Sequence, residues 1–172
     1  MVALNHLPRP PELPVLISNM APYNHNQNTP EKKYDDKVVE IKRVSKKTKG
    51  GNQISFTALV VSGDKKSKVG VGLGKAKNVA DAIKKAAQKA QKKMIVVPIV
   101  NGTIPHMVKT KFKAGIVLIR PGKKGSGVIA GGPVRTVVEA AGIQDIVSKI
   151  IGSRNKSINV WTTLKALSLL KE

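Results

Sequence analysis

The segment 69–77 is rich in glycine and lysine. Glycine occupies positions 70, 72 and 74, and Lys75 and Lys77 follow. Glycine-rich segments that lead into a helix bind nucleotide phosphates in two common patterns. The dinucleotide fingerprint G-x-G-x-x-G needs a glycine where this chain has Lys75. The phosphate loop G-x-x-x-x-G-K-[ST] needs a glycine at Val69 and a hydroxyl at Ala76. Both nucleotide-binding interpretations therefore fail on residue identity.

Two other interpretations of these glycines remain. Gly70 and Gly72 are expected to let a helix approach the strand closely, since glycine has no side chain in the way. Gly74, with Lys75 and Lys77, is instead expected to form a phosphate-contacting helix entrance, where backbone N–H groups and ammonium groups converge. A second basic, glycine-rich loop, Pro121–Gly127, carries Lys123 and Lys124.

The chain has little else with which to do chemistry. It has no cysteine, and its three histidines, His6, His25 and His106, are far apart without ligand-like spacing. We therefore expect no catalytic residue, no metal, no cofactor and no small-molecule substrate.

The charge of the chain points to an anionic partner. Lys and Arg number 31 against 10 Asp and Glu, a formal net charge of +21. No apolar run is long enough to span a bilayer, and the lysines do not lie on one amphipathic helix, so nucleic acid is favoured over a membrane surface. With five aromatic residues, too few for a base-stacking sheet face, recognition should run through phosphates, 2′-hydroxyls and shape.

Residues 1–31 differ from the rest of the chain. They hold six prolines and a single basic residue, Arg9. They lack the features of a signal or transit peptide, and we expect a disordered or extended arm.

Residues 32–98 predict a β-β-β-α unit, an antiparallel sheet backed by one helix. The first strand begins near Asp36, and its side chains Val39, Ile41 and Val44 are expected to point inward. A basic loop with two glycines, Lys46–Asn52, follows this strand. The second strand alternates Ile54, Phe56, Ala58 and Val60. The third strand enters a helix with Asn78 as N-cap and Asp81 as a weak capping-box partner. The apolar stripe of this helix is expected to comprise Val79, Ile83, Ala86, Ala87, Ala90 and Met94.

Residues 99–172 predict an α/β sandwich. Asn101 and Gly102 mark a turn, and strands are expected over 103–112 and 113–121. A helix with Pro133 at its first position should end at Gly142, followed by a strand over 143–152 and a helix from near Ser157. We expect Trp161 to pack in the core rather than stack on bases.

Four sequence blocks carry a family resemblance: KRVSKKTKGGNQISFTALVVSGD, VGVGLGKAKNVADAIKKA, GSGVIAGGPVRTVVEAAG and IGSRNKSINV. In this order they resemble the fifth protein of the small ribosomal subunit, over roughly residues 36–170. The resemblance implies an α+β fold: a double-stranded-RNA-binding-like β-β-β-α domain at 32–98, then a C-terminal α/β sandwich with a left-handed β-α-β crossover at 99–172.

The resemblance also implies a structural role in the bacterial-type ribosome of the cytoplasm, an organellar one being the alternative. The implied partners are small-subunit ribosomal RNA, ribosomal proteins four and eight, and messenger RNA at its entrance, with an influence on decoding accuracy. Candidate protein-interface residues are Gly127 and Arg135, at the contact with protein four. Candidate RNA-binding residues are Arg43, Lys46, Lys47, Lys49, Gly50, Gly51, Asn52, Lys75, Lys77, Lys123 and Lys124.

Two other functions remain as alternatives. A kinase-like enzyme on the shared C-terminal fold would need a phosphate loop and a catalytic base, and no acidic residue or Ser/Thr pattern completes such a site around Pro121–Gly127. A free-standing double-stranded-RNA binder would share the charge and the glycine-rich strand but would act outside the ribosome.

Overall fold

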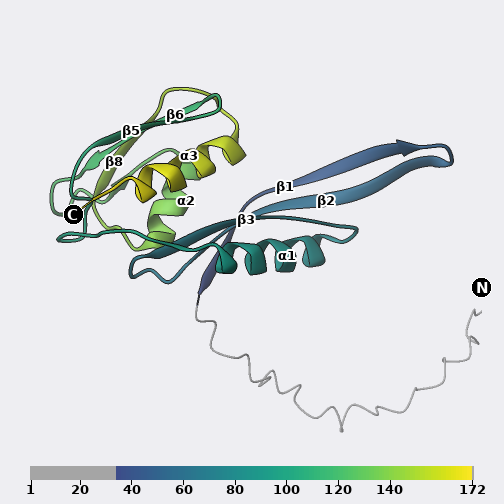
Figure 1. Ribbon diagram of the computed structural model, residues 1–172, viewed down its shortest axis with the longest axis horizontal. Coiled ribbons are helices and arrows are strands. Elements are labelled where there is room, and N and C mark those ends of the chain that lie inside the picture. The colour runs from purple at the N-terminus through teal and green to yellow at the C-terminus, as the bar shows by residue number, and fades with distance from the viewer. Residues whose placement is uncertain (1–33, 172) are drawn as a thin grey trace, which may run out of the picture. The chain divides into compact units, whose positions relative to one another are not determined.

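A computed structural model of the chain describes residues 34–171 (Figure 1). The arm expected over residues 1–31 lies outside these residues. The described residues form two β-sheets and three helices.

The first sheet contains β1 (Asp35–Thr48), β2 (Gly51–Gly63), β3 (Lys68–Ala76) and β4 (Ile95–Val96), in the order β1-β2-β3-β4. All neighbours are antiparallel. α1 (Val79–Lys92) covers one face of this sheet. The predicted β-β-β-α order is confirmed, and the short β4, which the sequence pattern did not predict, follows it.

α1 packs against β3 through a ladder of glycines. A Cβ atom at Gly70, Gly72 or Gly74 would overlap a helix carbonyl oxygen, of Ala90, Ala86 and Ala82 respectively. These alanines lie four residues apart and are fully buried on the helix face that meets the sheet. Gly74 thus serves the same close packing as the other two glycines, and Ala82 belongs to the buried stripe that was predicted without it.

The prediction that Ile41 points into the core is wrong. β1 has a bulge between Val38 and Glu40, which shifts the register against β2 by one residue. Val39, at the bulge, packs against the core. Ile41 pairs with Ala58 on the α1 side of the sheet but is 44% exposed, because α1 lies mainly over β2 and β3.

The second sheet contains β5 (Val108–Phe112), β6 (Gly115–Pro121), β7 (Val128–Ile129) and β8 (Ile146–Ile150), in the order β5-β6-β8-β7. β7 and β8 are parallel and are joined through α2 (Gly132–Ala141). α2 carries Pro133 in its first turn and ends at Gly142, which adopts the left-handed conformation at φ 89°. α3 (Lys156–Ser168) begins one residue before the predicted start, and the Asn155 side chain caps it by accepting from Ser157 N at 3.0 Å.

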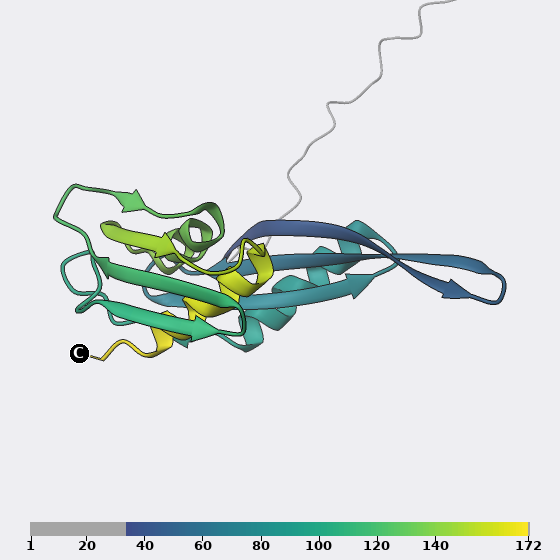
Figure 2. The same ribbon diagram turned by 90° about the horizontal axis from the view of Figure 1, so that it is seen from above.

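α2 and α3 lie between the two sheets (Figures 1 and 2). They cover the face of the first sheet opposite α1 and the inner face of the second. One core cluster therefore runs through both: it includes Leu59, Val61, Val69, Val71, Val117, Ile119, Val134, Val138, Ile146, Val160 and Leu167. The chain has a two-domain α+β fold whose two sheets share this core.

Candidate nucleic-acid interface

The basic segment Lys46–Asn52 is the end of a two-stranded ribbon, not a loop as predicted. The last β2–β3 pair is Phe56 with Ala76, whereas β1 and β2 stay paired as far as Thr48 and Gly51. The ribbon therefore projects beyond β3 (Figures 1 and 2). Only Lys49 and Gly50 form the turn, and Thr48 Oγ1 donates to Gly51 O at 2.8 Å.

The ribbon presents cations on both of its faces. Lys46 pairs with Gln53 and Lys47 with Asn52, and all four residues are exposed. Because successive strand residues point to opposite faces, the ammonium groups of Lys46 and Lys47 lie on opposite sides, with Lys49 at the tip. A flat anionic surface that lay against one face of the ribbon would therefore meet only one of these two ammonium groups.

A second group of candidates lies where the ribbon leaves the sheet. Arg43 pairs with Phe56, which pairs with Ala76, and Ala76 lies between Lys75 and Lys77. Asn78 occupies the N-cap position of α1, but its side chain caps no backbone N–H group. These cations therefore stand beside a helix N-terminus without a side-chain cap, a setting that favours anions.

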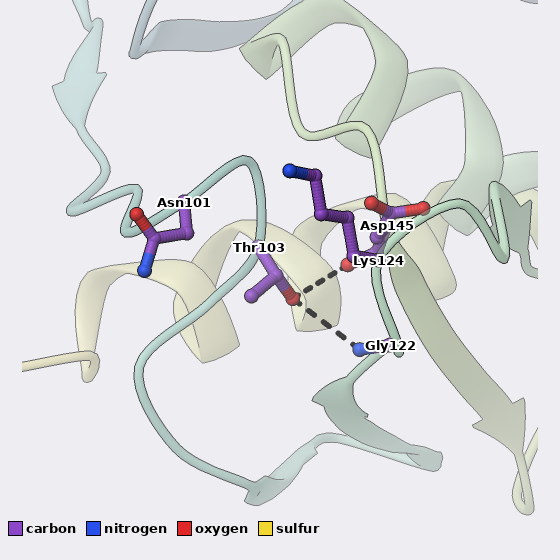
Figure 3. A pocket seen from close by; sticks show the side chains of 5 residues that line it. All are labelled: Asn101, Thr103, Gly122, Lys124 and Asp145. Atoms are coloured by element: carbon purple, nitrogen blue, oxygen red, sulfur yellow. Dashed lines mark hydrogen bonds between the residues drawn. The ribbon is translucent and has the colours of Figure 1, made fainter.

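The remaining candidates lie elsewhere. In both views the loop between β6 and β7 and the tip of the ribbon lie at opposite ends of the described structure (Figures 1 and 2). Lys124 lines a pocket of about 580 Å³ with Asn101, Thr103, Gly122 and Asp145 (Figure 3). Lys123 lines a different pocket of about 410 Å³, on the side of Arg120 and Val147. The structure thus places the RNA-binding candidates in three groups: the end of the ribbon, the base of the ribbon, and the loop between β6 and β7.

The glycine-rich loop is built around a residue that the sequence analysis missed. The Asp145 side chain is nearly buried, and its two carboxylate oxygens accept from Gly127 N at 2.8 Å and from Gly125 N at 3.1 Å. In a phosphate loop such N–H groups would be free to bind a nucleotide. Here the Asp145 carboxylate already accepts from both N–H groups, so they are not free for a nucleotide, which argues against the kinase-like alternative. The one sequence signal was that Asp145 is the only acidic residue between Glu139 and Glu172.

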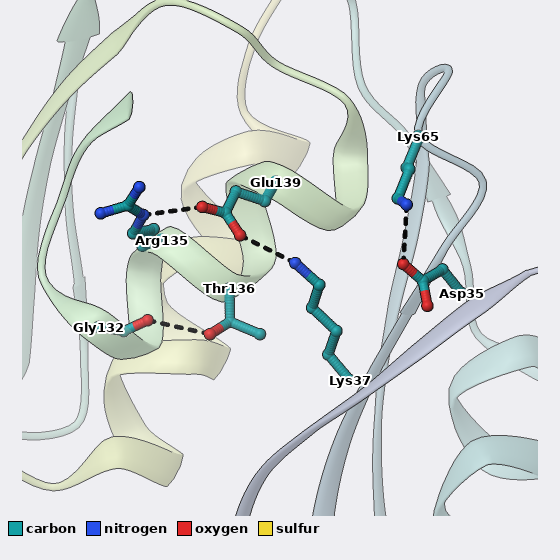
Figure 4. A network of polar contacts seen from close by, with 7 residues as sticks. All are labelled: Asp35, Lys37, Lys65, Gly132, Arg135, Thr136 and Glu139. Atoms are coloured by element: carbon teal, nitrogen blue, oxygen red, sulfur yellow. Dashed lines mark hydrogen bonds and ion pairs between the residues drawn. The ribbon is translucent and has the colours of Figure 1, made fainter. Parts of the chain in front are cut away.

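Arg135 has a carboxylate partner within the chain. Its Nε donates to Glu139 Oε1 at 2.7 Å, one helical turn later, and Glu139 Oε2 accepts from Lys37 Nζ at 2.9 Å (Figure 4). Hydrogen bonds from Lys37 and Arg135 lower the pKa of Glu139 below its usual value. Arg135, although it is a cation near the N-terminus of α2, therefore has an acidic partner within the chain and does not require one from another molecule. The expected interface role of Gly127 and Arg135 stays a prediction.

Trp161 is half-buried and packs against the core, as predicted. Between residues 34 and 171, no helix is long and apolar enough to cross a membrane. In the same part of the chain, no cluster of three His, Cys, Asp or Glu side chains could hold a metal ion.

An exposed basic ribbon, a basic helix entrance and a glycine-rich loop closed by a carboxylate are features of a nucleic-acid-binding protein rather than of a nucleotide-using enzyme. Family comparisons give the particular class. Residues 34–98 match the N-terminal domain of ribosomal protein S5, and residues 110–172 match its C-terminal domain.

Two relatives carry the name small ribosomal subunit protein uS5. The one from Treponema denticola is 48% identical over 147 residues, which cover 86% of this chain and 84% of the relative. The one from Chloroflexus aurantiacus is 54% identical over 134 residues, which cover 78% and 75%. The chain belongs to the ribosomal protein S5 family, whose members are structural, non-enzymatic, RNA-binding components of the small ribosomal subunit.

Proposed function

We propose that the chain binds small-subunit ribosomal RNA mainly through phosphates, with the β1–β2 ribbon enclosed between RNA segments. The observation that carries this proposal is the placement of Lys46 and Lys47 on opposite faces of an exposed ribbon, with Lys49 at its tip. A ribbon that lay flat on one surface would leave one of these ammonium groups in solvent. Arg43, Lys75 and Lys77 extend the contact at the base of the ribbon.

We also propose a finer role, which the family resemblance supports. The chain contacts ribosomal proteins four and eight, lines the messenger-RNA entrance and influences decoding accuracy, in a bacterial-type ribosome of the cytoplasm. Gly127 and Arg135 form the contact with protein four. In support of this, Arg135 is 57% exposed despite its bond to Glu139, so its guanidinium can also meet a neighbouring protein.

Sedimentation of the full-length tagged protein through a sucrose gradient in high salt tests this function. We expect the wild-type chain to co-migrate with small subunits, and we expect the variant Lys46→Gln, Lys47→Gln, Lys49→Gln to be retained less at the same salt. A wild-type chain that stays at the top of the gradient, yet binds duplex RNA in isolation, would favour the free-standing double-stranded-RNA binder.

A further inference from the structure

The pocket on the Arg120 side of the glycine-rich loop is basic. It has a volume of about 410 Å³ and is lined by Arg120, Pro121, Gly122, Lys123, Ser126 and Val147. Two of these residues are cations, one has a hydroxyl group, and none is acidic. Arg120 reaches the pocket from the end of β6, and Lys123 and Ser126 belong to the loop itself.

The pocket on the opposite side of the loop differs in having an acidic residue in its wall. The pocket there includes Lys124 but also Asp145 (Figure 3). A carboxylate in the wall disfavours a second anion, so of the two pockets only the Arg120 side has the electrostatics of an anion site. A guanidinium can also hold a phosphate with two parallel hydrogen bonds, which an ammonium group cannot.

Asp145 fixes the loop that forms this pocket. Besides binding Gly125 N and Gly127 N, it accepts through its main-chain oxygen from Thr103 Oγ1 at 2.6 Å and from Gly122 N at 3.4 Å. Its own N–H donates to Gly102 O at 3.1 Å. Asp145 therefore joins the 101–103 turn, both ends of the loop and the start of β8. Within the loop, Ser126 N donates to Lys123 O at 3.0 Å, which sets the two lining residues relative to each other.

We propose that Arg120, Lys123 and Ser126 form a binding pocket for a backbone phosphate of RNA, and that Asp145 is the residue that positions it. The proposal rests on the proposed function and adds a site that includes Arg120, which the sequence pattern did not identify. The buried carboxylate does not touch the RNA. It holds the loop so that the pocket exists before RNA arrives, and binding then loses little free energy to ordering the loop.

Filter binding of the full-length protein to purified small-subunit ribosomal RNA, over a series of KCl concentrations at fixed Mg²⁺, tests the site. Each neutralised phosphate adds roughly 0.7–0.9 to the log–log salt slope. We expect Arg120→Gln to lower the slope by about that amount, and Ser126→Ala to weaken binding without changing the slope. The matched control is Lys165→Gln, which removes one exposed charge from α3, outside the pocket. Equal slopes for wild type and Arg120→Gln, or equal losses for Arg120→Gln and Lys165→Gln, would overturn the site.

A coupling measurement tests the role of Asp145. Asp145→Asn removes the charge at nearly constant size, and we expect it to weaken RNA binding and to speed amide exchange at Gly125 and Gly127. In a background that already carries Arg120→Gln and Lys123→Gln, the same change should have little further effect on RNA binding. An undiminished effect there would mean that Asp145 acts through general stability, which thermal melts of each variant would also report.

Two further outcomes separate the proposals. If wild-type protein binds the RNA with a steep salt dependence while Arg120→Gln impairs only subunit incorporation, the pocket contacts a protein, and the phosphate site is wrong although the proposed function stands. If the wild-type protein fails to bind the RNA at all, the proposed function fails and the site fails with it.

Discussion

Lys37 Nζ lies 2.9 Å from Glu139 Oε2 and thereby links β1 of the first sheet to α2. Glu139 is also bound by Arg135 (Figure 4), so one carboxylate is shared by two cations from different elements. The two matched family segments, 34–98 and 110–172, are thus joined by an ion pair as well as by a common core.

This link should make stability depend on pH. Because the pKa of Glu139 is lowered from its ordinary value of 4.5, its contribution is present above about pH 4.5 and is lost as the pH falls through the folded-state pKa. For a side chain that is one-third exposed, solvent screening limits the contribution to about 0.5–1 kcal/mol. Urea unfolding of wild type and Glu139→Gln should differ by this amount at pH 7 and converge in acid, once the pH lies below the folded-state pKa of Glu139. The same difference at both pH values would contradict the assignment.

The glycine ladder should not tolerate a methyl group. Gly72→Ala would push a Cβ into the carbonyl of Ala86, and the helix cannot retreat locally because Gly70 and Gly74 hold it on either side. We expect a loss of about 1–3 kcal/mol in the free energy of unfolding. Gly50→Ala is the matched control, since a Cβ there meets nothing within 4 Å. Denaturant titration compares the two, and equal stabilities would contradict the close packing.

The ribbon lysines should dominate the salt dependence of RNA binding. Replacing Lys46, Lys47 and Lys49 with glutamine should lower the log–log slope by about two to three. A matched triple change at exposed Lys65, Lys66 and Lys68, in and just after the turn between β2 and β3, removes the same charge and should have less effect. Filter binding at several salt concentrations measures both. A wild-type slope for the ribbon variant would mean that its lysines are merely solvated.

Decoding should respond to Gly127 and Arg135. Gly127 has φ 67° and donates its N–H to Asp145, so Gly127→Arg strains the loop. Arg135→Leu removes one partner of Glu139 and the cation offered to a neighbouring protein. A partly exposed ion pair contributes on the order of 1 kcal/mol, enough to shift an open–closed balance several-fold. A dual-reporter readthrough assay should show raised error for both variants with normal subunit profiles, but not for the neighbouring Thr136→Ala. Wild-type error rates for both would refute the role.

Local patterns predicted most of the fold. The alternation of Phe56, Ala58 and Val60, the glycines before α1, and the pair formed by Pro133 and Gly142 each depend on neighbours in sequence. Such patterns predict which elements form. The β-β-β-α order and the two-domain α+β class were therefore accessible from the sequence.

The errors arose where distant segments meet. The bulge at Val39 reverses the expected side of Ile41, and a bulge leaves no mark in the hydrophobic pattern. The ribbon appeared as a loop because lysine and glycine are poor strand formers, and only cross-strand pairing extends β1 through them. Asp145 and Thr103 are 42 positions apart, so their bond could not be predicted from spacing. Arg120 was missed because its pocket is completed by a loop that folds back toward it.

The shared core has a consequence for synthesis. α1 follows β3 directly and can cover one face of the first sheet as soon as it leaves the ribosome. The opposite face, with Leu59 and Val61, waits for α2, whose Val134 is made 75 residues after Leu59. At roughly 5–20 residues per second, that apolar face stays open for about 4–15 s. A nascent chain that stalls before α2 would therefore carry a paired sheet with one uncovered side, a form that chaperones and proteases recognise.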